Sequence, residues 1–342
     1  MNRLLGALAG VALLASACSQ RSGSDSHLLS YAGQNGRIAF TSTTGGSVDI
    51  WVANADGSHR IRLTSNAASD LHPRWSPDGS VIAFTSYRSG NGDIYTMRSN
   101  GSAVQRITSS AAFDGYPSWS PDGARIAFTS TRSGNLDIWV VTLSSSRVVR
   151  LTSDWADDFA PAWSPSGDRI AFTSNRNSNS DLYTMRSDGS DQRALTDDSH
   201  ADAYPAWSPD GTRIAFESNR KGNYDLWVKN SDGTGIHRLT QSSRFDGYPN
   251  WSPDGTRLLF TSSRSGNQGI WVANADGSGA ASLITNFGVT TWPDWQTIPL
   301  PSPTPSPSPS DTASPSPSSS PSDSPSPSPS DTTSPTASPT GP

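Results

Sequence analysis

The sequence predicts an all-β protein, a six-bladed β-propeller with four-stranded blades. A Pro-x-Trp element recurs along the chain at a constant spacing of 44 residues, and an Ile-Ala-Phe-like element recurs at the same spacing. Each unit contains four short segments rich in β-branched and aromatic residues, separated by turn residues. Four strands in a unit of roughly 40 to 45 residues are typical of a propeller blade. The prolines of the repeated element are Pro73, Pro117, Pro161, Pro205, Pro249 and Pro293.

The unit that begins at Pro117 shows the four expected strands in order. The first lies around PSWS and is followed by an SPDG turn, in which Asp and Gly tolerate a positive φ. The second, RIAFTS at 125–130, alternates apolar residues, and the third, DIWVV at 137–141, is rich in β-branched and aromatic side chains. The fourth strand ends in RLT at 150–152. We expect the repeated tryptophans to pack between blades, because a tryptophan buries a large apolar area.

The phase of the repeat predicts how the ring closes. The chain enters the repeat region at Gly36, partway through a unit, with the second to fourth strands of a blade. It leaves at 292–295 with only a first strand. Together these two fragments complete one blade, so the closing blade is shared between N- and C-terminal strands and no sheet edge is left open at the junction.

Residues 1–17 have the layout of a secretory signal peptide. Arg3 supplies the positive charge, and the apolar run 4–14 is too short to span a bilayer as a helix. Cys18 is the only cysteine of the chain and directly follows Ala-Ser-Ala, as in bacterial lipoproteins. We therefore expect a lipid on Cys18, a flexible tether over 18–35, and an extracytoplasmic lipoprotein anchored to a membrane, in the periplasm or at the cell surface. Ordinary cleavage after Ala17, with an incidental thiol, is the alternative.

Residues 299–342 form a tail rich in proline, serine and threonine, with no aromatic residue, lysine or arginine. Such a composition cannot bury apolar surface, so we expect the tail to be disordered. The whole chain has a formal net charge of −5 and no long basic run, which argues against a nucleic acid as partner. The expected organisation is a signal peptide, a tether, a propeller over 36–298 and this tail.

The stretch DGYPSWSPDGARIAFTSTRSGNLDIWV, which begins at Asp114, resembles the repeats of TolB-like β-propellers. The resemblance extends over the whole expected propeller and implies the six-bladed fold. A role in a Tol–Pal envelope system does not follow from this resemblance. TolB itself has an additional N-terminal α/β domain; only a short stretch separates Cys18 from the first expected strand, so we expect that domain to be absent.

Two repeated polar positions lie in loops that propeller topology places on the same face. An aspartate precedes five of the six repeated prolines by three residues, and an arginine follows five of the six second strands. The shared blade has Thr290 and Thr44 at these positions, so it lacks both partners. A carboxylate and a guanidinium form a well-defined bidentate pair, and we expect one such pair in each of the other five blades. These pairs are Asp70–Arg88, Asp114–Arg132, Asp158–Arg176, Asp202–Arg220 and Asp246–Arg264.

A ring of five carboxylates at a channel mouth could also suit Ca²⁺, which takes about six to eight oxygen ligands. If each aspartate is paired with an arginine, the ring is structural and we expect neither a metal nor another cofactor. The next aspartate of each repeat, such as Asp137 or Asp181, could compete for the same arginine.

Residues that vary between repeats on this face are the expected ligand contacts. Aromatic side chains around a shallow funnel, with an acidic notch, suit a peptide segment or a sugar. The alternative is that the rings simply plug the channel. The expected contacts are His72, Tyr116, Asp157, Asp158, Tyr204, Tyr248 and Trp292.

Catalysis has little support in the sequence. Some TolB-like propellers are polysaccharide lyases with a histidine-rich metal site, but only His72 and His200 fall near the funnel. A glycosidase needs two facing carboxylates, for which Asp157 or Asp158 with Asp202 could be nominated. We expect a non-catalytic, monomeric binding module for an envelope protein or peptide. A carbohydrate-active or cell-wall sugar-binding protein is the alternative.

Overall fold

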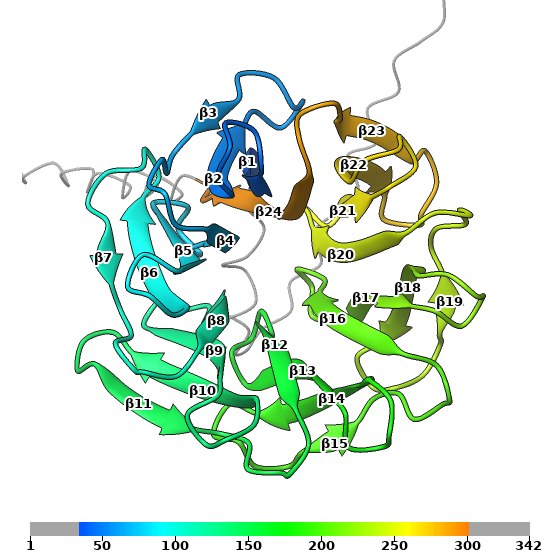
Figure 1. Cartoon of the computed structure of the whole chain (residues 1–342). Helices are drawn as coiled ribbons and strands as arrows, with labels where there is room; N and C mark the ends of the chain where they lie inside the picture. The colour runs from blue at the N-terminus through cyan, green and yellow to red at the C-terminus, as the bar shows by residue number, and fades with distance from the viewer. Residues whose placement is uncertain (1–33, 301–342) are drawn as a thin grey trace, which may run out of the picture. The chain divides into compact units, whose positions relative to one another are not determined.

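The computed structural model describes residues 34–300, which form six four-stranded antiparallel sheets arranged in a ring (Figure 1). The predicted six-bladed β-propeller is therefore confirmed. Within these residues no helix is long and apolar enough to cross a membrane. The expected signal peptide 1–17, Cys18 and nearly all of the tether and tail lie outside the described residues.

In five blades the strands run from the channel to the periphery in chain order, and in the shared blade the last strand of the chain is innermost. The innermost strands are β4 (Asp70–Trp75), β8 (Asp114–Trp119), β12 (Asp158–Trp163), β16 (Asp202–Trp207), β20 (Asp246–Trp251) and β24 (Thr290–Ile298). The second strands are β1 (Gln34–Ser42), β5 (Val81–Ser86), β9 (Arg125–Ser130), β13 (Arg169–Ser174), β17 (Arg213–Ser218) and β21 (Arg257–Ser262).

The third strands are β2 (Asp49–Ala53), β6 (Asp93–Arg98), β10 (Asp137–Thr142), β14 (Asp181–Arg186), β18 (Asp225–Asn230) and β22 (Gly269–Asn274). The outermost strands are β3 (Ile61–Arg62), β7 (Gln105–Arg106), β11 (Arg147–Arg150), β15 (Arg193–Ala194), β19 (His237–Arg238) and β23 (Ala281–Ile284).

The closing blade is shared between the two ends of the propeller, as the phase of the repeat predicts. β24 pairs antiparallel with β1, and the register places Trp295 opposite Ile38 and Thr290 opposite Ser42. β1 begins at Gln34, two residues before the expected boundary. In Figure 1 the last strand lies beside the first, so the ring closes through strand pairing.

The core lies along the second strands and between neighbouring blades. The phenylalanine of every Ile-Ala-Phe-like element is fully buried. Trp75 packs with Ala39, Ile50 and Val52 of the preceding blade, and Trp163 packs with Ala127 of the blade before its own. The tryptophans thus fill the space between blades, which confirms their predicted role and fixes the position of each innermost strand around the channel.

Candidate binding site in the central channel

Every innermost strand carries a β-bulge that turns one residue toward the channel. The ladder between first and second strands shifts register around this residue in the blades of β4, β8, β12, β16 and β20. A β-bulge redirects a side chain, and a positive φ is uncommon for residues other than glycine. The residues at the bulge, with φ between 52° and 57°, are His72, Tyr116, Ala160, Tyr204, Tyr248 and Trp292.

The five rings of this set, which we call the aromatic plug, meet across the channel. His72 stacks on Tyr116 with ring centroids 4.0 Å apart, and Tyr248 stacks on Trp292 at 3.8 Å. Trp292 also meets His72 edge-on at 4.6 Å and Tyr204 at 5.0 Å. The rings fill this end of the channel, as the plugging interpretation predicts; that they also contact a ligand stays a prediction.

His72 is buried inside the plug and is a neutral ring. Burial, and then the Arg74 charge, lower the pKa of His72 to about 3. Its Nδ1 lies 3.2 Å from the Thr85 hydroxyl. His72 therefore adds aromatic surface to the plug and carries no charge at neutral pH.

Hydrogen bonds from the preceding blade hold the bulges in place. The amide groups of Tyr116 and Tyr204 donate to the hydroxyls of Thr85 and Thr173, at 3.1 and 3.0 Å. The amide of Trp292 donates in the same way to Thr261. Thr129 holds the bulge at Ala160 in the same way, so the repeated threonine of RIAFTS fixes four of the six bulges. Thr41, the threonine at this position in the shared blade, has no hydrogen-bond partner for its hydroxyl within residues 34–300.

One repeat has glutamate in place of this threonine. Glu217 accepts the amide of Tyr248 through Oε2 at 3.1 Å, and only 4% of its surface is exposed. A Cβ on the neighbouring Gly247 would overlap this carboxyl oxygen, so the two residues are matched. Burial raises the pKa of Glu217 to about 8, and the group is mostly protonated at neutral pH. Sequence reasoning missed this residue, although RIAFES carries the only glutamate of the chain.

All five expected Asp–Arg pairs form. The five aspartates have no exposed surface, and Arg132 binds Asp114 in bidentate fashion, Nε–Oδ1 3.2 Å and Nη2–Oδ2 2.6 Å. Asp70–Arg88, Asp158–Arg176 and Asp202–Arg220 lie at 3.0, 2.6 and 2.5 Å, and Asp246 pairs with Arg264. In the shared blade the Thr44 hydroxyl instead lies 3.0 Å from Ser42 Oγ.

The competing aspartates have arginine partners of their own, which sequence reasoning missed. Each lies at the start of a third strand, and its arginine follows thirteen residues later on or beside the outermost strand. The pairs are Asp49–Arg62, Asp93–Arg106, Asp137–Arg150 and Asp225–Arg238, with distances of 2.6, 2.7, 2.7 and 2.5 Å.

Asp181 is the exception, because Ala194 occupies the position of the arginine. It is fully buried and accepts hydrogen bonds from Thr196 and Asn177. Burial raises the pKa of Asp181 to about 6. This blade therefore contains a buried carboxyl group whose usual cation is missing.

The acidic notch expected from Asp157 and Asp158 does not form. Asp158 has no exposed surface and is bound to Arg176, while Asp157 accepts the amide of Leu136 at 3.0 Å. Asp202 is likewise buried and paired, so the nominated glycosidase carboxylates are not presented to a substrate. His200 lies in an exposed loop, 2.8 Å from Asp198.

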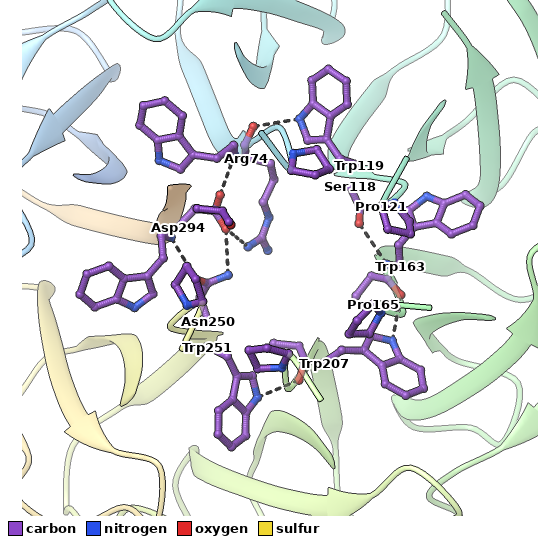
Figure 2. Close-up of a pocket in the computed structure, with 18 of the residues that line it drawn as sticks. Arg74, Ser118, Trp119, Pro121, Trp163, Pro165, Trp207, Asn250, Trp251 and Asp294 are labelled. Atoms are coloured by element: carbon purple, nitrogen blue, oxygen red, sulfur yellow. Dashed lines mark hydrogen bonds and ion pairs between the residues drawn. The ribbon is translucent and has the colours of Figure 1, made fainter. Parts of the chain in front are cut away.

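The opposite end of the channel contains a cavity of about 200 Å³ (Figure 2). Sequence reasoning assigned this end only to turns and to inter-blade packing. The prolines of the SPDG-type turns and the tryptophans of the innermost strands line it, and we call it the proline mouth. Its prolines are Pro77, Pro121, Pro165, Pro209 and Pro253, and its tryptophans are Trp75, Trp119, Trp163, Trp207, Trp251 and Trp295.

The floor of the proline mouth has a polar side and an apolar side. The residue between Pro and Trp of each repeat forms it, and these are Arg74, Ser118, Ala162, Ala206, Asn250 and Asp294. On the polar side, Asp294 Oδ1 accepts Arg74 Nη1 at 3.0 Å and Asn250 Nδ2 at 2.8 Å. On the apolar side, the Ala162 and Ala206 carbonyls accept indole N–H groups of the next blades. The mouth can therefore distinguish the two edges of a ligand.

In residues 34–300 no group of three or more His, Cys, Asp or Glu side chains is placed to hold a metal ion. The channel thus offers aromatic rings at one end, and prolines, tryptophans and one ion pair at the other. Such a set of groups suits recognition of a ligand by shape, apolar contact and hydrogen bonding.

The closed ring and its repeats define a TolB-type β-propeller protein. A family model described as the TolB beta propeller domain matches residues 110–203 and 196–297. A model of the Tricorn protease N-terminal beta propeller domain matches residues 32–135. The two TolB matches together span more than half of the chain, so the chain belongs to the TolB β-propeller family.

Individual relatives match over different lengths. The Tol-Pal system protein TolB of Anaeromyxobacter dehalogenans is 47% identical over 45 residues, which is 13% of this chain and 10% of that protein. This chain thus aligns with only a tenth of that curated relative. The crystal structure of TolB from Acinetobacter baumannii has a TM-score of 0.71 and 27% identity, covering 76% of this chain and 66% of that one. A putative TolB from Agrobacterium tumefaciens, with 21% identity, a TM-score of 0.63 and coverage of 78% of this chain and 99% of that one, shares the fold.

Proposed function

We propose that this protein is a non-catalytic binding module of the cell envelope, whose proline mouth receives a segment of another protein. Membership of the TolB family and the relatives named as Tol-Pal system proteins support an envelope role. The observation that carries the binding site is the cavity of about 200 Å³ at the proline mouth. Its tryptophan and proline walls supply apolar surface, and its floor supplies hydrogen-bonding groups, as ligand sites commonly do.

The aromatic plug is the second candidate for the same function. Tyr116, Tyr204, Tyr248 and Trp292 keep part of their surface exposed, and amphipathic rings of this kind are common in protein interfaces. A ligand at this end would lie over the rings, because they already contact one another. The proline mouth is favoured because its space is open.

Selection of peptides from a phage-displayed random library against the full chain tests the proposal. Ala162→Phe fills the proline mouth from its apolar side, and Ser145→Phe adds the same ring in an exposed turn as a matched control. We expect selected peptides to bind the wild type and Ser145→Phe alike, and to bind Ala162→Phe at least about tenfold more weakly.

The same selection distinguishes the two ends of the channel. Tyr204→Ala with Tyr248→Ala opens the aromatic plug and leaves the proline mouth intact. Loss of binding in this double variant, with full binding to Ala162→Phe, would move the site to the aromatic plug. Selection of no peptide above background, with all variants folded by circular dichroism, would overturn the binding-module proposal.

We further propose that Cys18 carries lipid and anchors the propeller outside the cytoplasm. The support is the lone cysteine directly after a signal-peptide-like segment. Metabolic labelling with a clickable palmitate analogue should mark the wild type and not Cys18→Ser. Equal labelling of both would show that lipidation does not occur at this residue.

A further inference from the structure

We infer that Arg74 is the anchor point for a carboxylate of the segment that enters the proline mouth. The carboxylate belongs to an aspartate, a glutamate or a chain end of that segment. This inference rests on the proposed function and gives its ligand a chemical class, an acidic extended peptide.

The geometry begins with the direction of the Arg74 side chain. It leaves β4 and projects into the channel, where it reaches across toward Asp294 (Figure 2). About a third of the side chain is exposed, 31%. Arg74 borders both the proline mouth and the small space beneath the aromatic plug. Among the residues that the structure describes, it is the only lysine or arginine that lines the mouth.

Arg74 retains donors that the described part of the chain does not use. Its one side-chain hydrogen bond within residues 34–300 runs from Nη1 to Asp294 Oδ1, at 3.0 Å. Nε and Nη2 have no acceptor there, and neither is among the buried atoms that lack a partner, so both remain accessible. A guanidinium presents five N–H donors in a planar fork and binds carboxylates through two of them at once.

The neighbouring polar groups are already occupied. Asp294 accepts from Arg74 and Asn250 through Oδ1 and from the Trp75 amide through Oδ2. Asn250 uses its own oxygen to accept the amide of Trp295. The free edge of Arg74 is therefore the strongest hydrogen-bonding feature of the floor that the described residues leave unused, and it can donate to a bound ligand.

A carboxylate is the acceptor that best fits this edge. It is planar, carries two acceptor oxygens and balances a guanidinium more strongly than a neutral carbonyl does. Across the floor, Ala162 and Ala206 offer only apolar surface. A bound segment would thus place its acidic group toward Arg74 and an apolar group toward the alanines.

The first experiment uses the simplest probes, acetate and acetamide, added to the full chain at constant ionic strength. The Arg74 Nε–H resonance is followed by NMR and assigned by its loss in Arg74→Lys; the exposed Arg147 provides an internal control. We expect acetate to shift the Arg74 resonance saturably, and to act at concentrations about tenfold or more below acetamide. A shift of Arg74 no different from that of Arg147 would overturn the inference.

The second experiment uses the peptides that lose binding in Ala162→Phe. Replacing their acidic residue by its amide should weaken binding to the wild type about 10- to 100-fold, the effect of one charged hydrogen-bonded pair. The replacement should have no effect on Arg74→Gln combined with Asp294→Asn, a variant that leaves neither ion unpaired. Peptides that bind the mouth equally with either residue would refute the role of Arg74 and leave the proposed function intact. Saturable acetate binding at Arg74, without any peptide whose binding depends on the proline mouth, would support the carboxylate-binding role of Arg74 and contradict the proposed function.

Discussion

Replacement of Glu217 by glutamine should change how the stability of the propeller depends on pH. The folded protein holds this carboxyl group with a pKa of about 8 against an ordinary value of 4.5, because burial opposes its ionisation. Between these two values the unfolded chain is ionised at this residue and the folded chain is protonated. The folded state then binds more protons, so stability falls as pH rises through this window.

The magnitude follows from the size of that window. One pH unit corresponds to about 1.4 kcal/mol for a group that is protonated only in the folded state. From pH 5 to pH 8 the wild type should therefore lose up to about 4 kcal/mol that Glu217→Gln retains. The surrounding tyrosines do not contribute, because burial raises the pKa values of Tyr204, Tyr224 and Tyr248 above their usual range.

Urea unfolding of both proteins at pH 5, 6, 7 and 8 measures this difference directly. Glutamine keeps the shape and can still accept the Tyr248 amide. Glu217→Thr, which restores the residue of the other repeats, is a second variant that should also remove the pH dependence. Wild-type and variant stabilities that run parallel over the whole range would refute the buried, neutral carboxyl group.

Three further predictions concern the repeated ion pairs and loops. Arg132→Ala should destabilise the fold by about 3–5 kcal/mol because it leaves buried Asp114 without its cation. A double-mutant cycle with Asp114→Ala should give a coupling energy of about 1–3 kcal/mol. Additive effects of the two substitutions would contradict the pairing. Ala194→Arg should supply the missing partner of Asp181 and stabilise the fold at pH 7 by about 1–2 kcal/mol. The same substitution should lower the pKa of Asp181 from about 6, and should reduce the stability that the protein loses as pH rises from 3.8 to 6. NMR titration of the Asp181 carboxyl group measures this pKa. An unchanged pKa would show that the arginine does not reach Asp181. Ser178→Gly should raise the thermal midpoint by an amount equivalent to about 0.5–1 kcal/mol, because Ser178 has a φ of 72° where other blades have glycine; a lower midpoint would show that the serine is not strained.

The periodic part of this protein could be predicted from its sequence. The constant spacing fixed the number of blades, and the phase at the two ends fixed their closure, because a strand with an unpaired edge finds its partner in the matching fragment. The five Asp–Arg pairs could also be predicted from the sequence. Each depends on two positions of one blade, and the joint absence at Thr44 and Thr290 identified the partners.

Periodicity could not assign the arginine partners of the third-strand aspartates, because both repeated aspartates of a blade lie within reach of the same arginine. The arginine thirteen residues later was visible in the sequence, but only the antiparallel register brings it beside the aspartate, as in Asp137 and Arg150. The acidic notch failed for a related reason. The charge of a loop residue does not predict whether its side chain is buried, and Asp158 is fully buried within its own blade.

The sequence by itself determined the ring, because blade number and closure depend on spacing, which a linear pattern records. Only the tertiary structure decided which end of the channel is open. The aromatic residues of the plug come from five separate blades. Whether their rings fill the channel axis or only line it depends on the direction that each bulge gives its side chain, and on distances between strands far apart in sequence. The contact of His72 with Trp292, and the position of Arg74 beside Asp294, arise only when the ring closes and joins the first and last repeats.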